Sequence, residues 1–405
     1  MKVLVLTTQF HQLNGAERLG VELAESLNAE AGWNAELGSL YRGDAPGVPE
    51  AETALRARGI EDFYHIGLNV RPGPWALILA VLRLRRHLRR GSFDIVETSQ
   101  ITPTILASWA SWGLKTAHVA GIHDVFSRER YDTRKHKIWR FSVRGKRCAR
   151  FYAISTYVAQ HWIVYSDTPA DKTALVPNAI PDDCFEALPD REGVRRELGL
   201  PPDAKIALFV GRMLKRKGID TVLEGVGPLL AREDLHLVYV GEWGYAPEHF
   251  FSGEATLQQS MLKEIAARDW GGRVHFLGRR GDVPRLMASS DVLVHPARIE
   301  GFGLVLAEAM AAGLPVVASH VEGIPEVLEG TDSIQVPPDD PAAVRDAVLE
   351  TLNRAPEAAR WAIGKGRERA EDFRLHNRLR ALTELFKSVG VVQFGPGGKT
   401  DKKQV

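Results

Sequence analysis

Short apolar runs alternate with amphipathic stretches along most of the chain. In the first half, six runs have the length and the β-branched content of strands: VLVLTT, NAELGSL, FDIVETS, TAHVAGI, RFYAIS and TALVPNAI. The stretches between them have helical spacing, among them PWALILAVLRLRRHLRR and a helix that runs to about Asn28. Strands that alternate with helices of about 10 to 15 residues predict βαβ units and parallel sheets.

This alternation breaks once, between about residues 180 and 200, where prolines and acidic residues are frequent. It restarts with IALFVGR, LHLVYVG, RVHFLG, DVLVHPA, LPVVAS and DSIQVPP. We therefore predict two doubly wound α/β domains in tandem, facing each other across a cleft. The expected boundaries are 1–185 for the first domain, 186–375 for the second, 376–390 for a helix that packs back towards the first, and 391–405 for a disordered tail.

Composition supports an ordinary folded protein. A chain of 405 residues exceeds what one hydrophobic core usually organises. Its net charge of +1 gives no reason to expect a nucleic-acid partner. The two cysteines, Cys148 and Cys184, form no CxxC pair and suit a reducing compartment. The longest apolar run, WALILAVL, is far below the ~20 residues that a membrane span needs, and MKVLVLTTQF has the pattern of a first strand, so we expect a cytoplasmic protein.

Charge is concentrated in one part of the chain. Residues 71–150 hold 17 lysines and arginines but only 5 aspartates and glutamates. One interpretation is peripheral contact with an anionic membrane or a diphosphate-linked lipid acceptor. The other is an ordinary solvated face of helices that pack on a core.

Two cations follow the first strand of the second domain. Ligands of open parallel sheets bind beyond the carboxyl ends of the strands. After IALFV, Gly211 ends the strand, and Arg212 and Lys217 stand in the segment that enters the next helix. A guanidinium and an ammonium beside a helix N-terminus suit a diphosphate. The alternative is a solvated basic loop.

Two carboxylates follow a later strand, DVLVHPA. Glu300 lies in the loop, GFG follows it, and Glu308 lies one turn inside a helix that begins near Leu304. The glycines let a ligand approach the backbone, and the helix start offers free N–H groups to a phosphate. Glu308 could accept bonds from two ribose hydroxyls. The alternative, an acidic cap plus a structural glutamate, leaves unexplained why both carboxylates flank a glycine pair at the ligand end of a strand.

Two residues of the first domain occupy similar positions. Gly15 follows Asn14 in a turn directly before a helix, so its backbone could meet a ligand. His123 follows the strand TAHVAGI and is a candidate site residue, although a lone histidine is as often structural.

Together these motifs resemble the retaining GT-B glycosyltransferases of family 4 (glycosyl transferases group 1), over residues 1 to about 389. FVGRMLKRKGID is similar to the family's diphosphate loop, and ARIEGFGLVLAEAMAAGLPVVAS to its Glu-x7-Glu block. EGIPEVLE resembles the GG-x-P-E element, with Glu322 in place of its first glycine. Asn14-Gly15 likewise stands where the family has Gly-Gly.

The resemblance implies that the first domain binds the acceptor and that the second binds the nucleotide-sugar donor. It also implies a role for each matching position. His123 approaches the transferred sugar, Glu300 binds its hydroxyls, Arg212 and Lys217 neutralise the diphosphate, and Glu308 holds the ribose. The remaining donor-binding positions supply backbone contacts or border the base: Gly15, Leu277, Gly278, Gly301, Phe302, Gly303, Leu304 and Val305.

The implied reaction is transfer of a hexose-type sugar from a nucleotide sugar, with retention of configuration, to a glycan or lipid-linked acceptor in polysaccharide or glycoconjugate biosynthesis. A UDP-sugar is the expected donor because such donors are commonest in the family. No metal or other cofactor is expected, because cations and helix N-termini stabilise the leaving phosphate and the sequence contains no Asp-x-Asp triplet. The alternatives are another GT-B enzyme, such as an epimerase, and a non-catalytic nucleotide-sugar-binding protein.

Overall fold

The computed structural model describes residues 1–11, 15–69, 72–125, 133–143, 147–231, 234–243 and 254–392, with the backbone alone at 16, 133–136, 254–255 and 390–392. Its contacts divide the chain into two compact units. The first comprises Met1–Asn178 with the segment from His376 onwards, and the second comprises Ala179–Leu375. That the first domain binds the acceptor and the second the donor stays a prediction.

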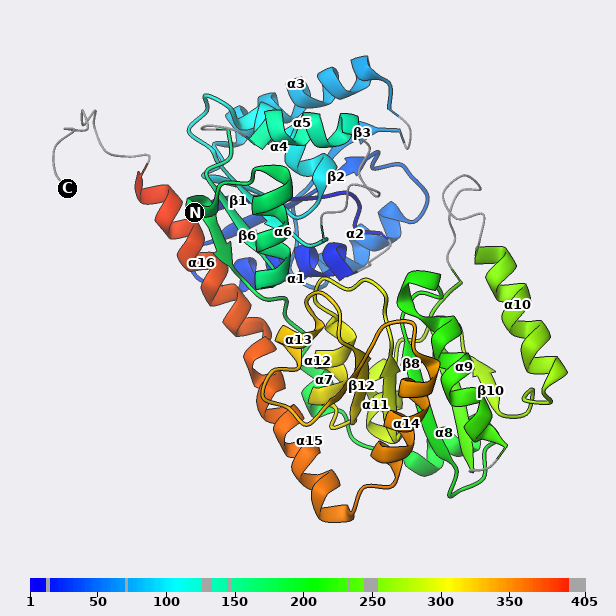
Figure 1. Ribbon diagram of the computed structural model, residues 1–405. Coiled ribbons are helices and arrows are strands. Elements are labelled where there is room, and N and C mark those ends of the chain that lie inside the picture. The colour runs from blue at the N-terminus through cyan, green and yellow to red at the C-terminus, as the bar shows by residue number, and fades with distance from the viewer. Residues whose placement is uncertain are drawn as a thin grey trace. The chain divides into compact units, whose positions relative to one another are not determined.

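The first unit is built on a seven-stranded sheet with the order β3-β2-β1-β4-β5-β6-β7, in which every neighbouring pair is parallel (Figure 1). Its strands are β1 (Lys2–Thr7), β2 (Asn34–Tyr41), β3 (Phe63–Leu68), β4 (Ile95–Thr98), β5 (Ala117–Ile122), β6 (Arg150–Ala153) and β7 (Thr173–Leu175). Its helices are α1 (Gly15–Ala29), α2 (Val48–Arg56), α3 (Pro74–Gly91), α4 (Ile101–Ser111), α5 (Thr133–Val143), α6 (Thr156–Ser166), the short η1 (Ala170–Lys172) and α16 (Leu375–Val392).

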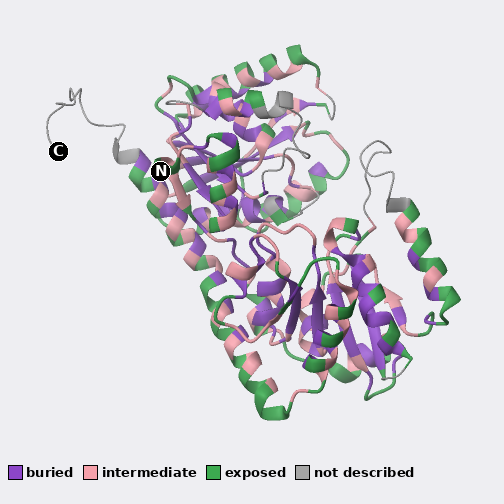
Figure 2. Cartoon of the chain, viewed as in Figure 1, coloured by how far each residue is buried: buried purple, intermediate pink, exposed green. Residues whose placement is uncertain are grey.

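Strand β1 is buried on both faces because helices cover both sides of the sheet (Figure 2). Val3 and Val5 lie in one core cluster, and Leu4 and Leu6 lie in the other, as the two-residue period of a strand requires. Helix α16 contributes to the cluster of Val3 through three side chains, Leu382, Phe386 and Val389. The last described helix is therefore part of the first unit's core. Within the predicted tail, residues 393–405 lie outside the described residues.

The second unit holds a six-stranded sheet, again parallel at every pairing, with the order β10-β9-β8-β11-β12-β13. Its strands are β8 (Lys205–Val210), β9 (Leu235–Val240), β10 (Val274–Phe276), β11 (Val292–His295), β12 (Val316–Ser319) and β13 (Ile334–Val336). Its helices are α7 (Asp183–Glu186), α8 (Arg191–Glu197), η2 (Lys215–Lys217), α9 (Ile219–Leu230), α10 (Glu254–Ala267), α11 (Val283–Ser289), α12 (Leu304–Ala311), α13 (Ile324–Val327), α14 (Pro341–Leu352), α15 (Pro356–Ala370) and η3 (Glu371–Phe373).

The strand order reverses once in each sheet, and this places the ligand sites. In the first sheet the reversal lies between β1 and β4, and in the second between β8 and β11. Crevices for ligands form at the carboxyl ends of the strands on either side of such a reversal. The predicted fold, two Rossmann-like parallel-sheet domains, is confirmed. Within the described residues, no helix is long and apolar enough to cross a membrane.

Candidate functional site

The chain leaves β8 through backbone that requires glycine. Gly218 ends η2 with φ 73°, and a Cβ there would lie 2.0 Å from the carbonyl oxygen of Pro296. Any side chain at this position would therefore push apart the loops that follow β8 and β11. In the loop after β8, Arg212 is exposed and Lys217 is half-buried.

The loop after β11 brings Glu300 to Lys217. The ammonium of Lys217 donates to Oε2 of Glu300, and Nε2 of His295 lies 3.2 Å from the same oxygen. The Lys217 and Glu300 side chains are 15% and 14% exposed, and that of His295 is 1% exposed. The two segments predicted to carry the site thus meet at the strand-order reversal of the second sheet.

Charge and burial compete at Glu300. Burial by itself would raise the pKa of its carboxyl, but the charge of Lys217 and the hydrogen bond with His295 outweigh burial and hold the pKa well below its usual range. Burial lowers the pKa of His295, so its ring is neutral at pH 7. Glu300 is therefore ionised near neutral pH, and its contacts with Lys217 and His295 are both made through Oε2.

Arg298 links the loop that follows β11 to the loop that follows β8. Its guanidinium donates to both carboxylate oxygens of Asp220, at 2.6 and 3.1 Å, and to the carbonyl of Lys215. Its backbone N–H donates to the carbonyl of Arg216 at 2.9 Å. Since Lys215 and Arg216 precede Lys217 in η2, Arg298 anchors the turn that carries the cation.

Glu322, which stands where the similar motif has a glycine, has a left-handed backbone. Its φ is 49°, in the left-handed region that costs an ordinary residue about 1 kcal/mol. Its carboxylate accepts the N–H of Glu300 at 2.7 Å, and the N–H of Gly323 donates to the carbonyl of Glu300 at 3.1 Å. The unfavourable backbone is thus offset by a bond that positions Glu300.

Helix α12 begins directly after this loop. Gly303 precedes it with φ 85°, and a Cβ there would approach Leu306 at 2.9 Å and Glu300 at 3.3 Å. The first N–H groups of a helix, here those of Leu304 and Val305, have no partner within the helix. Phe302 is buried and packs edge-to-face on Phe373 with ring centroids 5.3 Å apart. Gly301 lies in the loop, half-buried.

Glu308, Leu277 and Gly278 complete the predicted donor residues of the second unit. Glu308 lies on the second turn of α12 and is half-buried. Leu277 and Gly278 follow β10, where the N–H of Leu277 donates to the carbonyl of Tyr239 and the carbonyl of Gly278 accepts from Gly241. Both are half-buried at the carboxyl edge of the sheet, the same edge that carries Glu300.

The other two predicted residues, Gly15 and His123, belong to the first unit. Gly15 is the exposed first residue of α1, whereas Asn14 lies outside the described residues. His123 follows β5 and borders a cavity of about 290 Å³. The cavity is lined by polar and apolar side chains from the carboxyl ends of β1, β4 and β5 and from three helices, α4, α5 and α6: Thr8, Ser99, Gln100, Ile101, Thr102, Gly121, Ile122, His123, Asp124, Trp139 and Trp162.

His123 carries two polar atoms next to this cavity. Its two ring nitrogens are buried and have no hydrogen-bond partner among the described residues. Burial, with a smaller effect of the Arg378 charge, lowers the pKa of His123 to about 3, so the ring is neutral at pH 7. A neutral imidazole can donate from one nitrogen and accept at the other, which suits a ligand hydroxyl.

A buried carboxyl lies behind the cavity. Glu97 on β4 accepts bonds from Ser99 Oγ at 2.7 Å and from the hydroxyl of Tyr152 at 2.6 Å. Burial raises the pKa of Glu97, although the two hydrogen bonds and Arg378 act in the opposite direction. The Tyr152 ring meets that of His123 edge-to-face at 5.8 Å. Since Ser99 donates its proton to Glu97, it can only accept from a ligand in the cavity.

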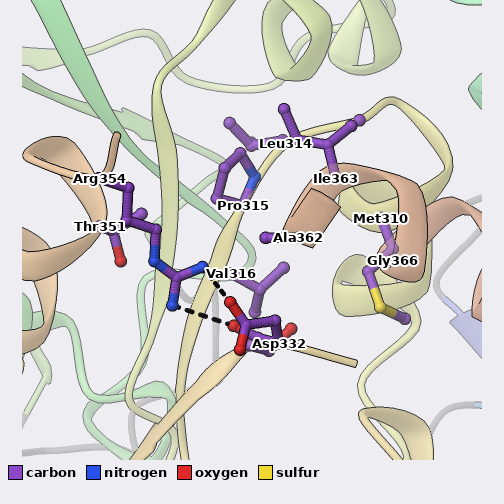
Figure 3. A pocket seen from close by; sticks show the side chains of 12 residues that line it. Met310, Leu314, Pro315, Val316, Asp332, Thr351, Arg354, Ala362, Ile363 and Gly366 are labelled. Atoms are coloured by element: carbon purple, nitrogen blue, oxygen red, sulfur yellow. Dashed lines mark hydrogen bonds and ion pairs between the residues drawn. The ribbon is translucent and has the colours of Figure 1, made fainter. Parts of the chain in front are cut away.

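A second cavity, behind β12, does not suit a nucleotide (Figure 3). It measures about 10 Å³, room for roughly one water. The ion pair of Arg354 with Asp332, at 2.7 Å, crosses it. Over the described part of the chain, no group of three or more His, Cys, Asp or Glu side chains is placed to hold a metal ion.

Sequence reasoning identified Lys217 and Glu300 but missed two of the residues that hold them. His295 could have been found as the polar residue that ends the apolar run VLVH. Arg298 gave no comparable signal, because a loop arginine two residues before a glutamate is ordinary.

Known sequence families match both halves of the chain. The family described as Glycosyltransferase Family 4 matches residues 13–183, and that described as Glycosyl transferases group 1 matches residues 204–354. An uncharacterized glycosyltransferase of Methanocaldococcus jannaschii, MJ1607, is 33% identical over 194 residues, 46% of each chain. The lipopolysaccharide core biosynthesis mannosyltransferase LpsB of Rhizobium meliloti is 28% identical over 230 residues, 56% of this chain and 62% of LpsB. The matches thus span about half of these relatives.

A solved structure matches almost the whole fold. The Anabaena protein Alr3699/HepE, in complex with UDP, superposes with a TM-score of 0.81 over 96% of this chain and 100% of that one, at 20% sequence identity. At that identity the likeness establishes the fold and leaves the substrates open.

Proposed function

Because the chain belongs to the group 1 glycosyl transferases of glycosyltransferase family 4, we propose that it transfers a hexose-type sugar from a nucleoside-diphosphate sugar to a glycan or lipid-linked acceptor. The observation that carries the proposal is the largely buried Lys217–Glu300 pair at the strand-order reversal of the second sheet, with Glu300 in the loop directly before α12. We take a UDP-sugar as the donor, and the UDP held by the structurally similar HepE supports this choice.

Lys217 can serve the diphosphate and Glu300 at once. An ammonium has three donors, and Glu300 takes one of them. The other two, with the exposed guanidinium of Arg212, neutralise the charge that develops on the leaving diphosphate as the bond between the sugar and the phosphate breaks. The first amides of α12, at Leu304 and Val305, add partial positive charge. We propose that these groups suffice without a metal ion.

Glu300 binds the transferred sugar in this proposal. Its carboxylate is ionised near neutral pH and anchored through Oε2, so its other oxygen can accept from sugar hydroxyls. Transfer with retention of configuration, without a covalent glycosyl–Glu300 intermediate, fits a carboxylate whose charge is already neutralised by Lys217 and is therefore a weak nucleophile. Glu308, one turn into α12, holds the ribose, and Leu277 and Gly278 border the base.

The acceptor belongs to the first unit in this proposal. The cavity beside His123 has room for a sugar ring, and its hydroxyl and amide groups together with Trp139 and Trp162 suit a polyhydroxylated ligand. The excess of basic residues in 71–150 attracts the protein to an anionic membrane that carries a lipid-linked acceptor.

Release of nucleoside diphosphate from UDP-, GDP- and ADP-sugars tests the proposal. The full chain is incubated with each donor, with and without a mixture of glycan and lipid-linked acceptors. We expect slow release from one base class alone, accelerated by acceptor, and a loss of about a hundredfold in Lys217→Met. Arg360→Gln, an exposed cation of α15, is the matched control and should behave as wild type. No release from any donor would favour a binding protein instead, and release without transfer to any acceptor would favour another GT-B enzyme.

A further inference from the structure

Helix α3 presents an unpartnered apolar surface. Four side chains of its first half are largely exposed: Trp75 at 79%, Ile78 at 51%, Leu79 at 51% and Leu82 at 56%. Their spacing of three and four residues places them on one face. The opposite face packs in the core through Ala80, Leu84 and Leu88, and it already holds the helix in place. The exposed stripe is therefore not needed for folding, and a stripe of this kind marks an interaction site.

The same face becomes cationic towards the C-terminus of α3. Arg83, Arg86, Arg89 and Arg90 are exposed and continue the line of the apolar stripe around the helix. The helix contains no aspartate or glutamate, and among the described residues none of these arginines forms an ion pair. Such a face has an apolar half and an uncompensated positive half.

The surface continues onto neighbouring elements of the first unit. Helix α3 packs on α4, and α4 packs on α5 (Figure 1). Arg85 of α3 donates to the carbonyl of Trp112 at 2.6 Å, and the guanidinium of Arg147 lies 4.6 Å from the Trp112 ring and 4.8 Å from the Phe141 ring. Trp112 is 51% exposed and Phe141 58% exposed.

With Ile138, this surface gathers seven of the thirteen large exposed apolar side chains of the described residues. We call it the α3–α5 surface: Trp75, Ile78, Leu79, Leu82, Trp112, Ile138 and Phe141, with the exposed arginines of α3.

We propose that the α3–α5 surface inserts its apolar side chains into the interface of an anionic lipid bilayer, with the arginines of α3 against the lipid phosphates. Tryptophan, leucine and isoleucine beside arginine are the composition of helices that lie in a membrane interface. A protein partner would need an acidic surface to match the arginines. An anionic membrane supplies phosphates for the arginines and an apolar interior for the exposed stripe. The inference deepens the membrane contact proposed above, and it can be tested without catalysis.

Co-sedimentation with vesicles is the first test. The full chain is mixed with vesicles of phosphatidylcholine alone or of phosphatidylcholine with phosphatidylglycerol. We expect binding to the anionic vesicles and little to the neutral ones. The variant Arg86→Gln/Arg89→Gln/Arg90→Gln should bind anionic vesicles about a hundredfold more weakly, since each arginine near such a surface contributes about fivefold.

The apolar half has its own variant and matched control. Trp75→Gln/Ile78→Gln/Leu82→Gln should reduce binding at least about tenfold at unchanged charge. Trp361→Gln on α15, 57% exposed in the second unit, should bind as wild type. Release of nucleoside diphosphate from a soluble donor should be unchanged in both α3 variants, so failure to bind vesicles and failure of the proposed activity are separate results.

Site-specific labelling tests insertion directly. The two native cysteines, Cys148 and Cys184, are buried, so a thiol introduced by Ile78→Cys can be labelled selectively with an environment-sensitive fluorophore. Anionic vesicles should increase and blue-shift its emission, whereas the same label at Leu188→Cys, exposed in the second unit, should not respond. The proposal is overturned by wild-type protein that binds neither vesicle type, by a silent label at position 78, or by self-association that the Trp75 variant abolishes without any vesicle binding.

Discussion

Replacement of Lys217 by methionine separates the structural and the binding roles of the cation. In the wild-type chain Lys217 compensates Glu300, whose side chain is 14% exposed. Lys217→Met leaves that carboxylate buried beside a neutral histidine, which costs about 3 kcal/mol of unfolding free energy at pH 7. In the proposed complex it also removes a charge-assisted hydrogen bond to the diphosphate, so UDP should bind about ten- to a hundredfold more weakly.

The double variant Lys217→Met/Glu300→Gln tells these two effects apart. Without the buried charge, most of the lost stability should return, whereas UDP affinity should stay low because no cation has been restored. The stability that Lys217→Met loses relative to wild type should also become smaller between pH 7 and about pH 5. When Lys217 is absent, burial raises the pKa of Glu300, and the carboxyl takes up a proton.

Denaturant unfolding and isothermal titration with UDP measure these effects, with Arg360→Gln as the control. If the double variant is no more stable than Lys217→Met, the two side chains are not coupled and the pair does not hold the loops. If Lys217→Met binds UDP as wild type does, the cation does not contact the diphosphate.

Two further predictions concern stability. Gly218→Ala should destabilise the second unit by about 2 kcal/mol or more, because it adds a clash with Pro296 to the left-handed backbone, whereas Gly330→Ala, at φ 74° with no atom within 4 Å, should cost only about 1 kcal/mol. Equal costs in denaturant unfolding would contradict the clash. Burial lowers the pKa of His118 to about 3, as it does for His123, so the folded state excludes a proton that the unfolded chain accepts. Stability should therefore fall as pH drops below about 6.5, by about 2 kcal/mol per histidine at about pH 5; His118→Asn should lessen this slope, and an unchanged slope would refute the assignment.

Much of the fold was predictable because its signals are local. Apolar runs buried on both faces, such as VLVLT in β1, stand out in any window of the sequence, and the alternation with helices determines that the sheets are parallel. Strand β3 was not predicted. Its segment FYHIGL is an edge strand of mixed burial in which polar residues and a glycine interrupt the apolar pattern.

The candidate site was predictable where residue type and strand exit coincide. Lys217 and Glu300 each follow a strand that the pattern identifies, so their meeting at the reversal of strand order could be expected. Arg298 could not be found in this way, because its role rests on Asp220 and on the carbonyl of Lys215, some 80 residues earlier in the sequence. The hydrogen bond from the Glu300 N–H to the Glu322 carboxylate could not be predicted either. It depends on a left-handed backbone at Glu322, which a glutamate normally disfavours.

A crystal structure of the chain with a non-transferable UDP-sugar analogue tests the central claim most directly. The account predicts diphosphate oxygens within about 3 Å of Lys217 Nζ and of the Arg212 guanidinium, and a sugar hydroxyl at the same distance from the Glu300 carboxylate. A diphosphate bound away from the loops that follow β8 and β11, or a Glu300 that still contacts only protein atoms, would contradict it.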